Sequence, residues 1–225
     1  TSMTAQVRSL GMAERNANDG ISMAQVADGA AGQTTAILTR MRELAVQSMN
    51  GSLVTGDRSN LDTEFTQLKS EIDRIAQVTN FNGINLATGS SGTTVNFQVG
   101  ANTSSNDQLS IVFGKLDSAA LNVSSGGVST AVAASTAISA IDTALASVST
   151  QRASFGAAIN RLQTTVGNLQ SMKTNLSAAN SRIRDVDVAE ESAQMARQQV
   201  LSQAGASILS QANSAPQMAL SLLRG

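Results

Sequence analysis

The chain has 225 residues, of which 15 are basic and 16 acidic, giving a net charge of −1, and it contains no cysteine and no histidine. Without a basic block, a thiolate, an imidazole or an uninterrupted apolar run of membrane length, we expect no enzymatic activity, no metal or other cofactor, no nucleic-acid partner and no membrane insertion. All five aromatic residues are phenylalanines and there is one proline, a composition that favours long packed helices over a thick globular core.

The first predicted element is a long helix over residues 1–50. From residue 10 onward, small and apolar residues recur at two positions of a heptad, which places them on one helical face. The first position contains Leu10, Ala17, Ala24, Ala31, Leu38 and Ala45, and the second contains Ala13, Gly20, Ala27, Thr34, Met41 and Ser48. Because these side chains are small, a neighbouring helix can approach closely along the whole length.

A second helix is predicted to end near Val78. The run Asn50-Gly51-Ser52 interrupts the first helix, and the segment 59–62 contains residues that commonly cap a helix start. Apolar residues then follow at steps of three and four. They are Leu61, Phe65, Leu68, Ile72 and Ile75. A turn is expected at residues 80–83.

Beyond this turn the apolar period changes to two, which is typical of strands. Val95, Phe97 and Val99 alternate with polar residues, and so do Leu109, Ile111 and Phe113. The two runs predict a β-hairpin across residues 100–107. The Ser-, Ala- and Gly-rich stretch 118–130 is predicted to be a mobile connection.

A second long helix is predicted over residues 131–184. Its strongest heptad position is apolar seven times in succession, at Ile141, Val148, Phe155, Leu162, Leu169, Leu176 and Ile183. The companion position is polar at Arg152, Lys173 and Asn180, and polar residues at such places can fix register and orientation. A capping-box pattern at Asp187–Glu190 predicts a last helix.

The fold class predicted from these elements is mainly α: a long antiparallel helical rod, resembling a coiled-coil bundle, with a small β-hairpin region. We expect four segments. Rod helices occupy residues 1–80, the hairpin and its connection 81–130, the second rod helix 131–184, and a tail helix 185–225.

Two acidic groups could suggest chemistry. The cluster Asp185, Asp187, Glu190 and Glu191 could bind a cation, but carboxylates at a helix start also cap free N–H groups and complement the helix dipole, and we favour that interpretation. Glu71 and Asp73 could form an acid/base pair, although a solvated helix face is the simpler interpretation.

Some stretches of the sequence are more informative about the protein's family than the heptad pattern is. Residues 15–22, 41–48 and 81–83 resemble the N-terminal signature of bacterial flagellins, and residues 181–185 and 203–224 resemble the C-terminal signature. The resemblance implies a structural subunit that self-assembles into the flagellar filament for motility. It also implies secretion through the flagellar type III pathway, and a chain that begins after the family's N-terminal arm and is therefore N-terminally truncated.

The resemblance also implies partners and contact residues. The partners are other flagellin subunits, the flagellin export chaperone, the filament cap and hook-junction proteins, and a host Toll-like flagellin receptor. Receptor and subunit contact is expected at Arg40, Leu44 and Glu64, with Leu44 on the flank of the apolar stripe. Thr39 and Met41 depart from the family pattern, which has Gln and Val there. The residues expected to enter the filament core or bind the chaperone are Leu201, Ile208, Leu209, Met218, Leu222 and Leu223.

One alternative function belongs to a different class. A flagellin-like chain can act as a cell-surface adhesin, with the Ser- and Thr-rich hairpin segment Thr93–Asp107 meeting a ligand. The sequence shows no aromatic platform for a sugar there, which counts against a lectin.

Overall fold

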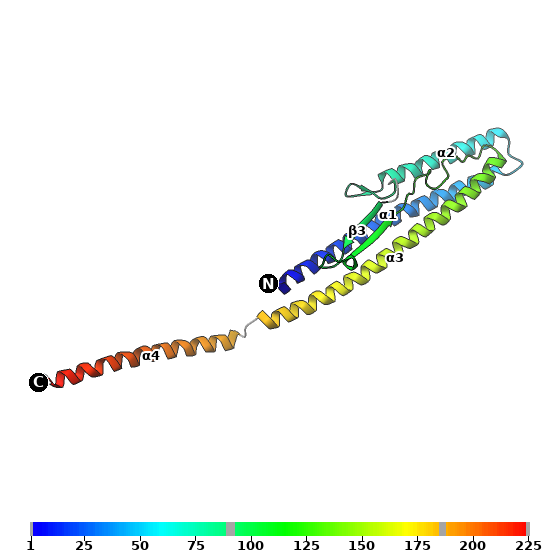
Figure 1. The fold of residues 1–225 in the computed structure, drawn as a ribbon. Helices are drawn as coiled ribbons and strands as arrows, with labels where there is room; N and C mark the ends of the chain where they lie inside the picture. The colour runs from blue at the N-terminus through cyan, green and yellow to red at the C-terminus, as the bar shows by residue number, and fades with distance from the viewer. Residues whose placement is uncertain (1, 89–92, 185–187, 224–225) are drawn as a thin grey trace. The chain divides into compact units, whose positions relative to one another are not determined.

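The computed structural model describes residues 2–88, 93–184 and 188–223, while the side chains of residues 184–189 and 213–225 lie outside this description. The chain divides into two compact units, Thr1–Ser177 and Ala178–Gly225. Figure 1 labels helices α1, α2, α3 and α4 and strand β3.

The first unit is built on three helices: α1 (Ser2–Ser48), α2 (Thr55–Val78) and most of α3 (Ala131–Arg184). Figure 1 shows the three lying side by side. Ion pairs join α1 to α3 in antiparallel order, and they are Glu14 with Lys173, Asp28 with Arg152, and Arg42 with Asp142. The predicted helical rod is confirmed.

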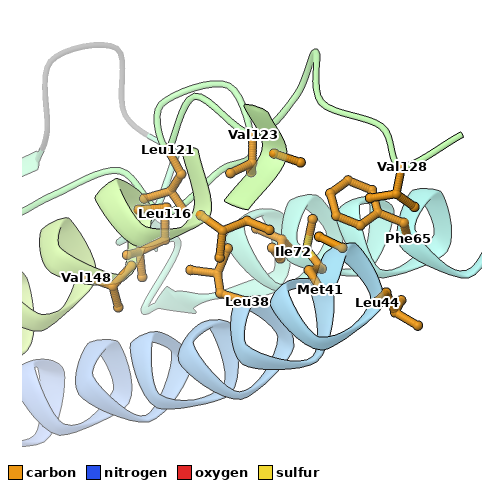
Figure 2. Close-up of a cluster of buried hydrophobic side chains, with 14 of the residues drawn as sticks. Leu38, Met41, Leu44, Phe65, Ile72, Leu116, Leu121, Val123, Val128 and Val148 are labelled. Atoms are coloured by element: carbon orange, nitrogen blue, oxygen red, sulfur yellow. The ribbon is translucent and has the colours of Figure 1, made fainter. Parts of the chain in front are cut away.

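The apolar stripe of each long helix is buried, as the heptad pattern predicts. In α1 all six residues of the first heptad position are at most 3% exposed. In α3 the burial extends from Ile141 to Leu169 and then fades, because Leu176 is only partly buried and Ile183 is 71% exposed. Figure 2 shows one of the resulting clusters, where Leu38 and Val148 lie among side chains of α1, α2 and α3.

The predicted hairpin is confirmed. Strand β3 (Thr93–Gln98) pairs antiparallel with β4 (Gln108–Phe113), with η1 (Ser105–Asp107) between them. The inward-facing residues Phe97 and Leu109 stand opposite each other and pack in a cluster with Ala24 of α1 and Phe155 of α3.

The turn predicted at residues 80–83 is a second, smaller hairpin. Strand β1 (Asn80–Phe81) pairs antiparallel with β2 (Ile84–Asn85). The two residues between them both have left-handed backbone, with φ of 49° at Asn82 and 80° at Gly83. This is the conformation for which an Asn-Gly dipeptide is suited in a two-residue loop.

Helix α2 begins earlier than the sequence pattern predicts. It begins at Thr55 rather than near Ser59, because Asp57 supplies the carboxylate that accepts a hydrogen bond from the Val54 amide, at 3.4 Å. One turn into α2, Arg58 donates hydrogen bonds to the carbonyls of Ser48 and Asn50, both at 2.9 Å. These bonds satisfy carbonyls at the end of α1 and fix the connection between the two helices.

The prediction of a mobile connection at 118–130 is wrong. Residues 114–130, which we call the strap, are fastened to α2 by side chains. Asp73 accepts from the Ser118 amide and hydroxyl at 2.8 and 2.9 Å, Asp62 accepts from the Val128 amide, and Lys69 donates to two strap carbonyls. The strap also contributes apolar side chains to the core. They are Leu116, Leu121, Val123 and Val128.

The second unit contains the end of α3 and helix α4 (Val188–Leu223). Every residue from 190 to 212 is exposed except Gly205, which is partly buried. The capping box predicted at Asp187–Glu190 includes residues outside the described part of the chain.

One helix in the described residues is long and apolar enough, by length and composition, to cross a membrane. It is α3, with an 18-residue window of mean hydropathy 1.5. Core helices of soluble proteins have the same property, and the apolar face of α3 is buried from Ile141 to Phe155, where Ile141, Val148 and Phe155 are at most 1% exposed. Small apolar residues among serines and threonines raise the mean hydropathy without an uninterrupted apolar run.

Candidate subunit-contact surfaces

The acidic residues that could have suggested catalysis are engaged in structural contacts. Glu71 pairs with Arg74 at 2.6 Å, and the hydrogen bond from this guanidinium lowers the pKa of the Glu71 carboxyl. Asp73 is not on a solvated face, since it holds the strap. Across the described residues, no group of three or more Asp or Glu side chains could hold a metal ion; Asp185 and Asp187 lie outside that part.

An exposed ion cluster joins α1 to α2. Arg40 donates to Glu64 through Nε at 3.0 Å and to Glu43 through Nη1 at 3.0 Å. These two hydrogen bonds, first that donated to Glu43 and then that donated to Glu64, raise the pKa of Arg40. The structure therefore brings together Arg40 and Glu64, two of the three predicted contact residues. Sequence reasoning missed Glu43, although its spacing of three from Arg40 on a helix is a signal for pairing.

Leu44, the third predicted contact residue, does not lie on the flank of the apolar stripe. Its side chain is 1% exposed and belongs to the cluster in Figure 2, which also contains Met41 and Phe65. The reason is that α1 packs against both α2 and α3, which requires a wider buried face than two heptad positions supply. Ile37, one heptad before Leu44, is partly buried in the same cluster.

The two departures from the family pattern have different surroundings. Met41 is fully buried, so its identity affects packing. Thr39 is exposed, and its hydroxyl donates to the Thr35 carbonyl at 2.9 Å. Of the two, only Thr39 changes the chemistry of the surface beside Arg40.

The tail residues form a second candidate surface. Leu201, Ile208 and Leu209 of α4 are each about two-thirds exposed, at 66%, 67% and 66%. The sequence pattern missed Met195 and Val200, which are 62% and 67% exposed on the same helix. The side chains of Met218, Leu222 and Leu223 lie outside the described part. A run of exposed large apolar side chains marks an interaction surface.

Comparisons with known proteins identify the same family at both ends of the chain. Residues 1–92 match the sequence profile of the bacterial flagellin N-terminal helical region, and residues 138–223 match that of the C-terminal helical region. The flagellin of Halalkalibacterium halodurans is 44% identical over 224 residues, covering 99% of this chain and 81% of that protein. The flagellar filament 33 kDa core protein of Treponema phagedenis is 41% identical, covering 99% of this chain and 82% of that protein.

A solved structure shows the same likeness in three dimensions. The crystal structure of Bacillus cereus flagellin superposes with a TM-score of 0.61 at 34% identity, and the match covers 74% of this chain and 94% of that chain.

Proposed function

Because this chain belongs to the bacterial flagellin family, it is a structural subunit of a flagellar filament, and we propose that α4 and the Arg40 ion cluster form its contacts with neighbouring subunits. The observation that carries this proposal is the exposure of large apolar side chains along α4. A helix with this surface gains stability when another helix covers it.

Covering the exposed apolar side chains of α4 would stabilise the assembled protein. Leu201, Ile208 and Leu209 are about two-thirds exposed, and full burial of one such side chain contributes roughly 1.5–3 kcal/mol. Isolated helices are marginal in water, so packing α4 against helices of other copies would both order it and drive assembly. The export chaperone is proposed to cover the same side chains before assembly, as the subunit leaves through the flagellar type III pathway.

The Arg40 cluster supports the second contact. Arg40, Glu43 and Glu64 each keep between 44% and 61% of their side chains exposed, and exposed ion pairs contribute little to folding. Arginine is enriched at protein interfaces. We propose that neighbouring subunits, including cap and hook-junction proteins at the filament ends, use this surface, and that the innate immune flagellin receptor binds it in the free subunit.

Filament formation by the full-length protein tests the α4 contact. Electron microscopy and sedimentation after addition of salt or filament seeds should show polymers for the natural sequence and for Gln198→Asp, an exposed polar position of the same helix. Ile208→Asp should prevent them, because it would bury an unpaired carboxylate. Equal polymerisation of the two variants would contradict the proposal.

A reporter-cell assay tests the receptor contact separately. Signalling by monomeric protein should fall for Arg40→Ala and stay unchanged for Arg74→Ala, which removes a similarly exposed guanidinium from an ion pair on α2. Equal signalling by both variants would exclude the Arg40 cluster as the receptor contact while leaving the filament proposal intact.

A further inference from the structure

The chain contains two exposed Asn-Gly dipeptides in different geometries. Asn50-Gly51 lies in the connection between α1 and α2, and Asn82-Gly83 forms the turn between β1 and β2. An asparagine followed by glycine can lose its side-chain amide through a cyclic succinimide. We propose that Asn50 is a site of this spontaneous modification in the folded protein and that the structure protects Asn82.

The side chain of Asn50 is held against its own turn by a hydrogen bond. The Ser52 amide donates a hydrogen bond to Asn50 Oδ1 at 3.1 Å. The ring closed by this bond includes the Gly51 nitrogen, so Asn50 Cγ is kept on the same side of the chain as the atom that attacks it. Negative charge develops on Oδ1 during the attack, and a donor already aimed at that oxygen stabilises the transition state.

The nucleophile is also accessible. Gly51 is exposed, and no side chain or backbone atom lies within 4 Å of the position where its Cβ would be. Within the described part of the chain, no acceptor binds the Gly51 amide. The nitrogen can therefore lose its proton to solvent without breaking an internal hydrogen bond.

The chemistry needs only water. The Gly51 nitrogen forms a bond to Asn50 Cγ, and the Cγ–Nδ2 bond breaks. The side-chain nitrogen leaves as ammonia, taking up the proton that the Gly51 amide lost. Water then opens the ring at one of its two carbonyls, giving aspartate or, when the main-chain carbonyl is attacked, isoaspartate.

Asn82 lacks this arrangement although its dipeptide is identical. The left-handed backbone of Asn82 and Gly83 is fixed by pairing of Phe81 with Ile84 on either side of the turn. Among the described contacts, none places a donor on Asn82 Oδ1. The two sites thus form an internal comparison in which the local sequence is the same and the geometry differs.

The carboxylate formed at position 50 would lie close to the positively charged side chain of Arg58. The Arg58 guanidinium donates to the Ser48 and Asn50 carbonyls, so a carboxylate at position 50 arises beside a positive charge. Aspartate retains the acceptor for the Ser52 amide and is accommodated there. Isoaspartate lengthens the main chain by one carbon and should loosen the link between α1 and α2.

The test compares the two sites in one sample. The full protein is incubated in mildly alkaline buffer, folded or in urea, and the mass increase from amide to carboxyl is followed in the peptides that contain Asn50 and Asn82. In the folded protein Asn50 should react at least about fivefold faster, the rate factor for a single hydrogen bond of about 1 kcal/mol. In urea the two rates should become similar.

Gly51→Ala is the matched variant. Space is open around the Gly51 Cβ position and its φ is not left-handed, so alanine fits the fold, while its methyl group hinders the attack. It should suppress reaction at Asn50 and leave Asn82 unchanged. Equal rates in the folded protein, faster reaction at Asn82, a ratio unchanged by urea, or no reaction at Asn50 would each overturn the proposal.

Discussion

Arg152 of α3 and Asp28 of α1 are 124 residues apart in the chain, yet Arg152 Nε lies 2.9 Å from Asp28 Oδ1. A second bond joins Nη2 to Oδ2 at 3.4 Å. The hydrogen bond to Asp28 is the main cause of the raised pKa of Arg152. Arg152 occupies a heptad position that is otherwise mostly apolar, and we expect this pair to fix the register of the two helices at one point along the rod.

Reversing one charge of this pair should destabilise the folded protein, and reversing both should restore it. Asp28→Arg places two guanidinium groups at the same crossing, whereas Asp28→Arg combined with Arg152→Asp recreates an opposite-charge pair. We expect a lower urea midpoint for the single variant, a midpoint near the natural one for the double variant, and a smaller difference in high salt. If the double variant were no more stable than the single one, the register role would be wrong.

The heptad pattern predicted the rod because burial against a long partner repeats regularly, from Leu10 in α1 to Leu169 in α3. It did not predict the strap, since the buried Leu121 and Val123 stand in a Ser- and Gly-rich stretch without a period. The contacts that fasten the strap join residues 45 or more positions apart. The position of Leu44 was missed for a related reason, because one sequence period cannot reveal that two helices pack on α1.

Acid should weaken the junction between α1 and α3 near Glu14. The hydrogen bond from Gln170, followed by that from Lys173, lowers the pKa of Glu14. A carboxyl with a lowered pKa contributes stability that is present above its unfolded-state pKa and is lost as pH falls through the folded-state value. Glu14→Gln should therefore lower the urea midpoint at pH about 7 and have little effect below the ordinary carboxyl range of about 4. The same deficit at both pH values would indicate a packing role instead.

Phe155 should contribute strongly to the stability of the rod. It is 1% exposed, and its ring lies 5.6 Å from that of Phe113 on the hairpin. Phe155→Ala should cost about 3–5 kcal/mol of unfolding free energy, since it removes these contacts and leaves a cavity. Ile183→Ala is the control at the same heptad position, because Ile183 is 71% exposed and its loss should stay within about 0.5 kcal/mol. Equal urea midpoints for the two variants would exclude the cavity argument.

Asp73 should hold the strap in place. Removing its carboxylate leaves the buried Ser118 amide without this acceptor, a cost of about 1–3 kcal/mol. Asp73→Ala should therefore raise amide hydrogen exchange across residues 114–130. Glu71→Ala, two positions away on α2, removes an exposed ion pair and should leave strap exchange unchanged. Exchange that rises equally in both variants would point to a general loosening of α2.

Arg40 and Leu44 lie one helical turn apart on α1. Substitutions at these two positions can therefore distinguish a residue that contacts a neighbouring subunit from one that packs in the core. Arg40 is half-exposed and Leu44 is 1% exposed. Substitution of Arg40 should therefore affect filament growth, and substitution of Leu44 should affect the stability of the monomer. Leu44→Ala should lower the unfolding free energy of the monomer by about 2–5 kcal/mol, whereas the volume-conserving Leu44→Met should cost less than about 1.5 kcal/mol.

Arg40→Ala should leave the urea midpoint of the monomer unchanged, because both of its ion-pair partners are exposed, and should slow filament growth from seeds. Leu44→Met should grow filaments at the natural rate, since its side chain does not reach the surface. A stable Leu44→Ala monomer would show that the core does not need this residue. Normal filament growth by Arg40→Ala would show that neighbouring subunits do not bind the Arg40 cluster.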